Sequence, residues 1–428
     1  MQIGKTNRSA PVTAGLLLGA CLFATVAPAQ SPPAANLPTW TMARADSGSS
    51  GAIGRNLPSQ LTLLWEAETA EAIESTPVSD GVNVYVADVM GGVEALDLAS
   101  GESRWRREFE TGFEASPGLF LPESIDANAA ESTAQIPVIE AASGNPAEDS
   151  AAADAAVRAI LVVSDVYGNI VALDPSTGES VWKYATEGQI SAAPTFFAVP
   201  RGDAYEVRVL QSSQDGNLYC LSAADGALVW KYETGDQIRC SASIAAGKTF
   251  LGGCDGQLHV IDLATGEPAR EPLPLGGPTG STPAVSGDEV FLPVMAGTLF
   301  AFHPSTGDVR WEFEDPDRPD EFRSSVAIGA DRIVVSSQNK HVDAIERASG
   351  ERIWRKTLRR RADASPLIAG DDVWIASTAG LLLRLSLADG DEKWSFESRG
   401  KFMAAPAVVG DRLIIADDDG VVRCFGPS

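Results

Sequence analysis

A run of basic side chains between positions 352 and 361 is the strongest candidate for binding chemistry in this chain. Guanidinium groups form bidentate hydrogen bonds with carboxylates, and the chain as a whole is strongly acidic, with 58 Asp and Glu against 33 Lys and Arg. The run therefore predicts local attraction of a partner; the alternative is a solvated basic face that balances nearby aspartates. Its members are Arg352, Arg355, Lys356, Arg359, Arg360 and Arg361.

Few other side chains have the spacing that catalysis or metal binding needs. The histidines His259, His303 and His341 are scattered in strand-like stretches, without the close spacing or the accompanying cysteines of a zinc site. The chain has neither two adjacent cysteines nor a Cys-x-x-Cys-His haem motif. We therefore assign no catalytic residue, no cofactor-binding residue and no metal ligand from the sequence, and we expect no cofactor.

A repeat carries these residues from Leu61 to the C-terminus, with a period of about 40 to 50 residues that is typical of β-propellers. Each unit holds an apolar strand, a Gly turn, a second strand ending in Asp, a Thr-Gly or similar turn, and a Trp. The Gly-turn half occurs eight times, and one copy spans Lys340 to Gly350. The tryptophan half also occurs eight times, with a degenerate copy near Ala269 that lacks the ring.

Four short alternating strands per unit make one blade, so the sequence predicts an all-β fold, an eight-bladed β-propeller of four-stranded repeats. The chain opens with a lone Trp half at Leu61 to Thr69 and closes with a lone Gly half at Gly420 to Gly426. We expect the N-terminal strand to complete the last blade, because this pairing removes the open edges. The Trp and Thr-Gly positions are then markers of the fold and not site residues.

The propeller is expected to span residues 61–428, interrupted at 122–158 by an acidic, alanine-rich insertion that we expect to be a disordered surface loop. Strand order puts the loop at 358–366 on the same face as the connection at 315–323, and the insertion on the opposite face. The first of these faces is the candidate interface. The candidate partner-binding residues on it are Phe322, Arg359, Arg360, Arg361 and Asp363.

The pairing of the cysteines in the propeller is open. Cys240 and Cys254 fall on neighbouring predicted strands of one repeat and could form a disulfide in an oxidising compartment. Cys220 and Cys424 occupy the same repeat position in different blades, where a small buried residue is expected. The alternative is four buried free thiols.

The N-terminus carries the pattern of an export signal over residues 1–29. Two basic residues precede an apolar run, and Ala27-Pro28-Ala29 supplies the small side chains that signal peptidase requires. Cleavage after Ala29 is the favoured interpretation; the alternative is a lipobox that ends at Cys21, with this cysteine acylated as the new N-terminus. Both interpretations export the chain, and no later stretch approaches the roughly 20 apolar residues of a membrane helix.

Residues 30–60 form a lead-in rich in Ser, Pro, Ala and Gly, which we expect to be flexible. Trp40, Met42 and Arg44 nevertheless suggest that part of it packs on the propeller. The net charge of −25 repels nucleic acid and the anionic face of a membrane. We therefore expect no nucleic-acid partner, and membrane contact only through a partner or a lipid anchor at Cys21.

The repeat Ala-Leu-Asp-x-x-Ser/Thr-Gly-x-x-x-Trp resembles the PQQ-like propeller repeat over nearly all of residues 61–428. Two families of eight-bladed proteins share it: quinoprotein dehydrogenases, which hold PQQ and calcium on the axis, and the outer-membrane assembly factor BamB, which holds neither. The dehydrogenases carry a vicinal disulfide and long loops over the quinone, whereas this chain has no Cys-Cys and mostly short connections. The segment Leu358 to Pro366 is similar to a Leu-Arg-x-x-Ser-Pro contact loop of the BamB family, with two additional residues.

The resemblance to BamB implies a non-catalytic, protein-binding scaffold of the cell envelope, periplasmic or associated with the outer membrane. Its partner would be an envelope protein, and an outer-membrane barrel assembly protein in particular. The alternatives are a propeller that binds PQQ or another small molecule on its axis, and an extracytoplasmic sensor module. The fold alone does not decide between these functions.

Overall fold

The computed structural model describes residues 39–125, 136–139, 158–202, 204–316 and 319–427. The predicted signal peptide, with Cys21 and Ala29, lies outside these residues, as does most of the insertion. The described residues form strands and turns with one 3₁₀ turn, η1 (Pro122–Ile125). None of them belongs to a helix long and apolar enough to cross a membrane.

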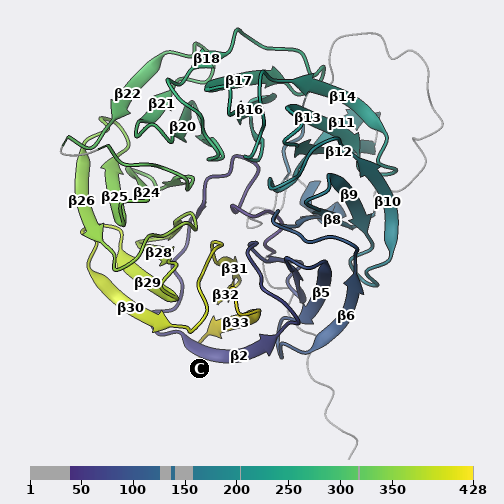
Figure 1. Cartoon of the computed structure of the whole chain (residues 1–428), viewed down its shortest axis with the longest axis horizontal. Coiled ribbons are helices and arrows are strands. Elements are labelled where there is room, and N and C mark those ends of the chain that lie inside the picture. Colours follow the sequence, from purple (N-terminus) through teal and green to yellow (C-terminus); the bar gives the residue numbers. More distant parts are fainter. Residues whose placement is uncertain (1–38, 126–135, 140–157, 203, 317–318, 428) are drawn as a thin grey trace, which may run out of the picture. The chain divides into compact units, whose positions relative to one another are not determined.

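Eight antiparallel sheets form a ring around a central axis, which confirms the predicted eight-bladed propeller (Figure 1). The first strand of each blade is innermost and the fourth is outermost. Blades 1 to 4 consist of β3 (Val78–Ser79), β4 (Asn83–Ala87), β5 (Gly92–Asp97) and β6 (Ser103–Glu108); β7 (Gly118–Phe120), β8 (Ile160–Ser164), β9 (Asn169–Leu173) and β10 (Ser180–Ala185); β11 (Thr195–Arg201), β12 (Ala204–Ser212), β13 (Asn217–Ser222) and β14 (Leu228–Glu233); and β15 (Ser243–Ala245), β16 (Lys248–Gly252), β17 (Gln257–Asp262) and β18 (Leu273–Pro274).

Blades 5 to 8 follow the same order. Their strands are β19 (Ala284–Ser286), β20 (Glu289–Pro293), β21 (Leu299–Phe302) and β22 (Val309–Phe313); β23 (Ala327–Ile328), β24 (Arg332–Ser336), β25 (His341–Glu346) and β26 (Arg352–Thr357); β27 (Leu367–Ala369), β28 (Asp372–Ala376), β29 (Leu381–Ser386) and β30 (Glu392–Glu397); and β31 (Ala407–Val409), β32 (Arg412–Ala416), β33 (Val421–Gly426) and β2 (Thr62–Glu68).

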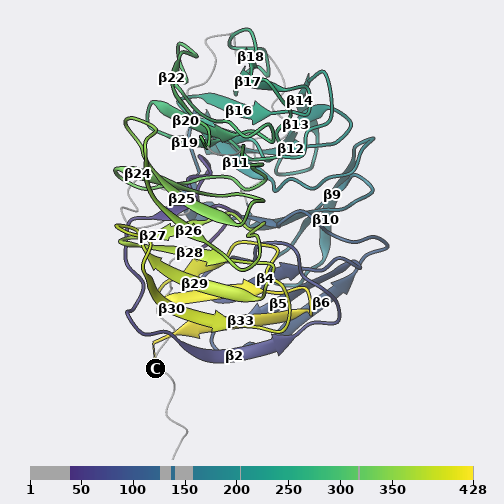
Figure 2. The same ribbon diagram turned by 60° about the vertical axis from the view of Figure 1, so that its left-hand side comes forward.

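The ring is closed by the N-terminal strand, as the out-of-phase repeat predicted. β2 pairs antiparallel with β33, from Thr62 opposite Gly426 to Glu68 opposite Val421, and the two lie side by side in Figure 2. Trp65 of β2 reaches into blade 1, where its indole Nε1 donates a hydrogen bond to the carbonyl of Leu98 at 3.0 Å. The last blade is therefore joined both to the start of the chain and to the first blade.

The same tryptophan contact recurs between neighbouring blades. The indole lies against a left-handed glycine of the next blade, so a Cβ at Gly178 would come within 2.5 Å of Trp105. Blade 4 lacks its tryptophan, and there the guanidinium of Arg270 lies against Gly307 instead. The conserved spacing of Trp and Gly within the repeat is thus explained by packing between blades.

Part of the lead-in runs through the central channel, and we call residues 39–58 the axial segment (Figure 1). Its backbone pairs with the innermost strands of six blades, where β1 (Ala52–Ile53) lies parallel to β27. Because an innermost strand has an open edge toward the axis, these bonds cover edges that no other strand pairs. The contacts are Trp40 with Ser79, Thr41 with Leu119, Ser47 with Ile244, Gly48 with Val285, Ser50 with Ile328 and Gly51 with Ile368.

Candidate functional site

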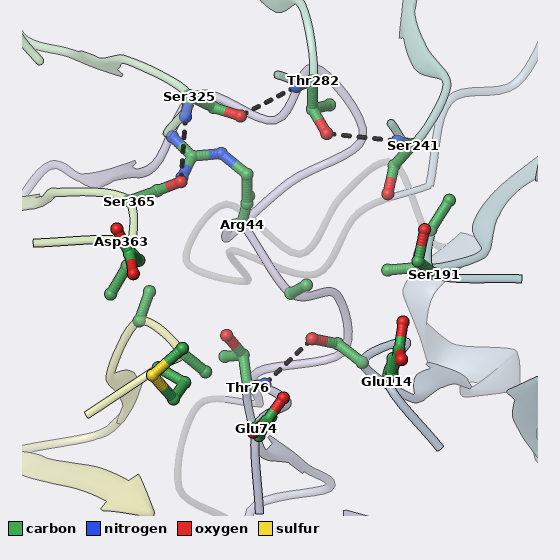
Figure 3. A pocket seen from close by; sticks show the side chains of 18 of the residues that line it. Arg44, Glu74, Thr76, Glu114, Ser191, Ser241, Thr282, Ser325, Asp363 and Ser365 are labelled. Carbon is green, nitrogen blue, oxygen red and sulfur yellow. Dashed lines mark hydrogen bonds between the residues drawn. The ribbon is translucent and has the colours of Figure 1, made fainter. Parts of the chain in front are cut away.

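Eight connections, each leading into the innermost strand of a blade, gather around the axis on one side of the ring, which we call the loop face. Residues from all of them line one cavity on the axis (Figure 3). Arg323 and Asp363 both line it, so the structure places the connections at 314–326 and 358–366 on the same face. The insertion follows β7 at the other end of an innermost strand. The eight connections are 69–77, 109–117, 186–194, 234–242, 275–283, 314–326, 358–366 and 398–406.

Three of the candidate arginines lie exposed on this face. Arg359 and Arg360 have no side-chain hydrogen bond or ion pair with any residue that the structure describes. Arg361 donates from Nε to the Asp363 carboxylate at 2.9 Å, and the other oxygen of that carboxylate accepts from Gln338 at 2.8 Å. Two guanidinium groups are thus free to bind a partner, and a third is held in place beside them.

A groove of about 480 Å³ adjoins these arginines. Its cations are Lys340, Arg360, Arg361 and Lys401, whereas its anions are Glu74 and Asp418. Lys401 pairs with Asp418 at 2.8 Å, which leaves more positive than negative charge in the groove. On a protein with a net charge of −25 this local excess favours a carboxylate-bearing partner. We call the groove together with Arg359 the basic groove.

Lys340 occupies a turn position that glycine fills in the other seven blades, with φ of 70°. A side chain in this left-handed conformation costs roughly 1–2 kcal/mol relative to the right-handed one. The backbone of this turn also supports the arginine loop, because the carbonyl of Lys340 accepts from the amide of Leu358 at 2.8 Å. Sequence reasoning did not single out Lys340, although the copy that begins with it is where the repeat departs from glycine.

The first half of the basic run has a different role, within the ring. Arg355 donates to the carboxylates of Asp320 and Asp343 at 2.9 and 2.6 Å and also pairs with Asp315. Arg352 reaches Asp315 at 3.0 Å. The three carboxylates are buried, and burial raises the pKa of Asp343 even though Arg355 opposes this effect. Arg352 and Arg355 therefore neutralise buried charge and are not free to bind a partner.

Phe322 is a correction to the predicted set. Its side chain is fully buried in the hydrophobic core between blades 5 and 6, in one cluster with Trp311 and Ile333. Phe322 was included because its connection lies on the same face as the arginine loop, but in the structure its ring packs into the core. Its neighbour Arg323 is exposed instead and pairs with Glu321 at 2.6 Å.

The acidic cluster also meets the distance requirement for a metal site. Ligand atoms of Asp315, Asp320 and His341 lie within 4.8 Å of one another. The guanidinium of Arg355 already bonds both carboxylates, so an ion would have to displace it. The cluster is accordingly accounted for as an ion-pair network, and we assign no metal to it.

The cysteines offer little reactivity. Cys220, Cys240, Cys254 and Cys424 are all free thiols, and Cys240 donates to the carbonyl of Gly252 at 3.1 Å. Burial raises the pKa of both Cys240 and Cys424 to about 12. A thiol that stays protonated at neutral pH is a poor nucleophile and a poor metal ligand.

The axial cavity has a volume of about 200 Å³ and is closed below by the axial segment, with Ala43 and Arg44 in its lining. Serine and threonine hydroxyls form part of its wall (Figure 3). Each of several hydroxyls accepts a hydrogen bond from the backbone of the preceding blade, so this wall also ties the blades together. These bonds run from Thr76 N to Ser116, Ser241 N to Thr282, Thr282 N to Ser325 and Ser325 N to Ser365, at 2.9 to 3.1 Å.

Comparison with known proteins assigns the family. The family model described as outer membrane protein assembly factor BamB matches residues 132–268, 198–340 and 314–427. The chain belongs to the BamB family. The resemblance read from the repeat is thereby confirmed, and the match extends across the Lys340 turn and the arginine loop.

Curated relatives in the BamB family are distant but align with this chain over most of their length. The outer membrane protein assembly factor BamB of Burkholderia pseudomallei is 25% identical over 372 residues, which cover 82% of this chain and 84% of the relative. The BamB protein of Shewanella oneidensis is 24% identical over 354 residues, which cover 76% and 80% of the two chains.

Solved structures bear on the fold of this BamB family member. The crystal structure of BamB from Moraxella catarrhalis is 20% identical, with a TM-score of 0.64, and the alignment covers 86% of this chain and 98% of that one. Quinohemoprotein alcohol dehydrogenase from Comamonas testosteroni is 12% identical, with a TM-score of 0.67 and coverage of 92% and 82%. An assembly factor and an enzyme thus share this propeller, so function must be argued from the site.

Proposed function

We propose that this chain is a non-catalytic scaffold of the cell envelope that binds an outer-membrane barrel assembly protein through the loop face. The observation that carries the proposal is the pair of free, exposed guanidinium groups of Arg359 and Arg360 in the basic groove. Such groups on a strongly acidic protein suit a partner segment rich in carboxylates, because bidentate pairs add geometric specificity to the attraction.

Two further features support a scaffold in preference to an enzyme. The axial segment occupies part of the channel in which a quinoprotein would hold its cofactor, and it is bonded to the innermost strands of six blades. The densest group of ionisable side chains among the described residues, Arg355 with its three aspartates, forms internal ion pairs. Named relatives are likewise assembly factors.

The proposal places the mature chain on the periplasmic side of the outer membrane. The export signal over residues 1–29 supports this placement. Attachment to the membrane would come from the barrel partner, or from acylation of Cys21 if the lipobox alternative holds. The mass of the N-terminal fragment from an envelope preparation distinguishes Gln30 from a lipidated Cys21.

A crosslinking pull-down from envelope fractions tests the proposal, with the mature chain from Gln30 as bait and mass spectrometry to identify what it captures. The native chain is expected to recover an outer-membrane barrel assembly protein, and the variant Arg359→Glu with Arg360→Glu to lose it. The matched control reverses two exposed charges on outermost strands, Lys183→Glu with Lys231→Glu, and should recover the barrel protein as the native chain does.

Each other outcome rejects a defined part of the proposal. If the native chain recovers no barrel protein, the assembly role is wrong. Should all three baits recover it equally, the scaffold role stands but the basic groove is not its interface. If the control and the arginine variant both fail to recover the barrel protein, the effect is one of net charge in general. The basic groove is then rejected as the interface.

A further inference from the structure

Arg44 lies in the floor of the axial cavity with an incomplete set of partners. Its guanidinium donates from Nη2 to the carbonyl of Val326 and from Nε to the carbonyl of Ser49 at 3.3 Å. No carboxylate within the described residues forms an ion pair with it, and the nearby Asp46 instead accepts from the amide of Ser50 at 3.0 Å. Nη1 thus has no hydrogen-bond partner among the described residues.

This guanidinium carries a charge that the protein only partly compensates. Burial lowers the pKa of Arg44 to about 10, against the attraction of Asp46, so the group still holds its proton at neutral pH. Arg44 is partly buried, and a charge partly withdrawn from water is destabilising unless it is paired. A carboxylate entering from the loop face would meet Nη1 and complete the pairing.

Two hydroxyl groups beside Arg44 can donate hydrogen bonds to the same carboxylate. Ser325 and Ser365 lie next to the guanidinium in Figure 3. Each oxygen already accepts from a backbone amide, from Thr282 N at 2.9 Å and from Ser325 N at 3.0 Å, whereas neither O–H has an acceptor among the described residues. A hydroxyl that accepts through its lone pairs keeps its proton for an outside acceptor. The site therefore offers three donors to one carboxylate: Nη1 of Arg44 and the hydroxyls of Ser325 and Ser365.

Two carboxylates lie across the cavity from Arg44; the lining also contains Asp363 and Arg323, which pair with Arg361 and Glu321, and Arg239. Figure 3 shows Glu74 and Glu114 across the cavity from Arg44. Glu114 accepts from Gln189 at 2.8 Å, whereas the carboxylate of Glu74 has no hydrogen-bond partner within the described part of the chain. Burial, and then repulsion by Glu114 and Asp418, raises the pKa of Glu74, although Lys401 counteracts this. An ammonium group between the two glutamates would relieve the repulsion.

We propose that the axial cavity binds a small zwitterion that carries one carboxylate and one ammonium group. The carboxylate contacts Arg44, Ser325 and Ser365, and the ammonium group lies toward Glu74 and Glu114. The volume of about 200 Å³ is below the range of drug-sized pockets and suits a free amino acid or a very short peptide. This inference does not depend on the barrel partner, because it needs only the purified chain.

Isothermal titration calorimetry of the mature chain tests the charge requirement without any mutation. Glycine, 4-aminobutyrate and glycylglycine are the zwitterionic probes, and they place the two charges at increasing separation. N-acetylglycine, glycinamide and methylammonium acetate are the controls, which lack one charge or carry the two on separate ions. At least one zwitterion is expected to bind saturably with one site per chain, and each control about tenfold more weakly or not at all. Absence of saturable binding by every zwitterion up to ~10 mM, or equal binding by a control, overturns the proposal.

Variants then locate the site. Glu74→Gln removes the charge of a side chain that makes no hydrogen bond within the described residues, so it should fold normally and weaken the zwitterion about tenfold. Arg44→Lys keeps the positive charge but loses the fork of donors, and a similar loss is expected. Glu312→Gln changes an exposed carboxylate on β22, away from the cavity, and serves as the control. Native affinity in both cavity variants would place the ligand elsewhere and refute the assignment.

Discussion

Arg355 and Arg360 stand five positions apart, yet the first neutralises buried aspartates and the second is free on the loop face. The difference in role follows from where each residue lies relative to β26. Arg355 lies on β26, opposite Asp343 of β25, whereas Arg360 lies in the connection beyond the end of β26. At the residue scale, the availability of a charge is set by its backbone position more than by the density of charges in the sequence.

Replacing Lys340 should raise the stability of the chain but weaken its capture of the partner. Lys340→Gly relieves the left-handed backbone and should stabilise the chain by about 0.5–1 kcal/mol, after allowance for the greater freedom of glycine in the unfolded state. The same change removes a cation from the basic groove and should weaken capture of the barrel partner. Denaturant unfolding measures the first effect and the pull-down the second.

A reciprocal variant controls for the turn itself. Gly216→Lys puts the same side chain at the equivalent turn of blade 3, where a Cβ would have 3.3 Å to its nearest atom, the carbonyl oxygen of Asp236. It should destabilise the chain by a comparable amount without altering capture. A stabilised Lys340→Gly variant with native capture would mean that the lysine serves neither the fold nor the groove.

The repeated motifs could be predicted from the sequence, but the contacts between non-repeating segments could not. Trp65 and the closing strand were predictable because their pattern recurs around the ring, with blade 4 as the exception. The burial of Phe322 and the pairing of Arg355 with Asp320 depend on contacts between segments outside the regular pattern, so no spacing reveals them. The sequence predicts that Arg44 belongs to a segment packed on the propeller, but not what surrounds it, because its contacts come from blades distant in sequence.

The axial segment shows at the element scale how an irregular peptide stabilises regular strands. It contributes only one short strand, β1, yet it accepts amide protons from the innermost strands of several blades. Two of its glycines allow close approach. A Cβ at Gly48 would lie 2.6 Å from the carbonyl oxygen of Val285, and one at Gly51, where φ is +61°, would meet Arg44 at 2.4 Å.

Gly48→Ala tests whether the segment is held as tightly as its bonds indicate. The added methyl group should force the segment away from β19 and destabilise the chain by about 1–3 kcal/mol. Hydrogen exchange should show faster exchange of the Val285 amide, which donates to Gly48 at 2.7 Å. Gly54→Ala is the control within the same segment, because its Cβ would have no atom within 4 Å and should change neither quantity. Unchanged exchange of the Val285 amide in the Gly48→Ala variant would show that the axial segment is only loosely held against β19.

At the scale of the whole propeller, the described residues form a ring whose seam lies between blade 8 and blade 1. Blade 8 combines β31, β32 and β33 from the C-terminus with β2 from the N-terminal side. The seam uses the same contact as the other junctions, since Trp65 bonds Leu98 at 3.0 Å and Trp182 bonds Ala223 at 2.9 Å. The ring should therefore be no weaker where its ends meet than elsewhere.

Truncating these two tryptophans compares the seam with an internal junction. Trp65→Ala and Trp182→Ala each remove a buried indole and should cost about 3–5 kcal/mol of the free energy of unfolding. Denaturant unfolding of both variants, followed by tryptophan fluorescence and circular dichroism, gives the two values. A loss below about 1 kcal/mol for Trp65→Ala alone would show that the seam is loosely packed.

The pairing of β1 with β27 and of β2 with β33 also affects the order in which parts of the propeller fold. Ala52 pairs with Ile368, and Thr62 pairs with Gly426, so these early segments stay unpaired until their distant partner strands have been made. Contacts so distant in sequence form slowly, because the entropy cost of closing a long loop comes before any stabilising contact is made. An unclosed chain lacks both the seam and the bond between β1 and β27, so we expect it to be less stable than the finished propeller.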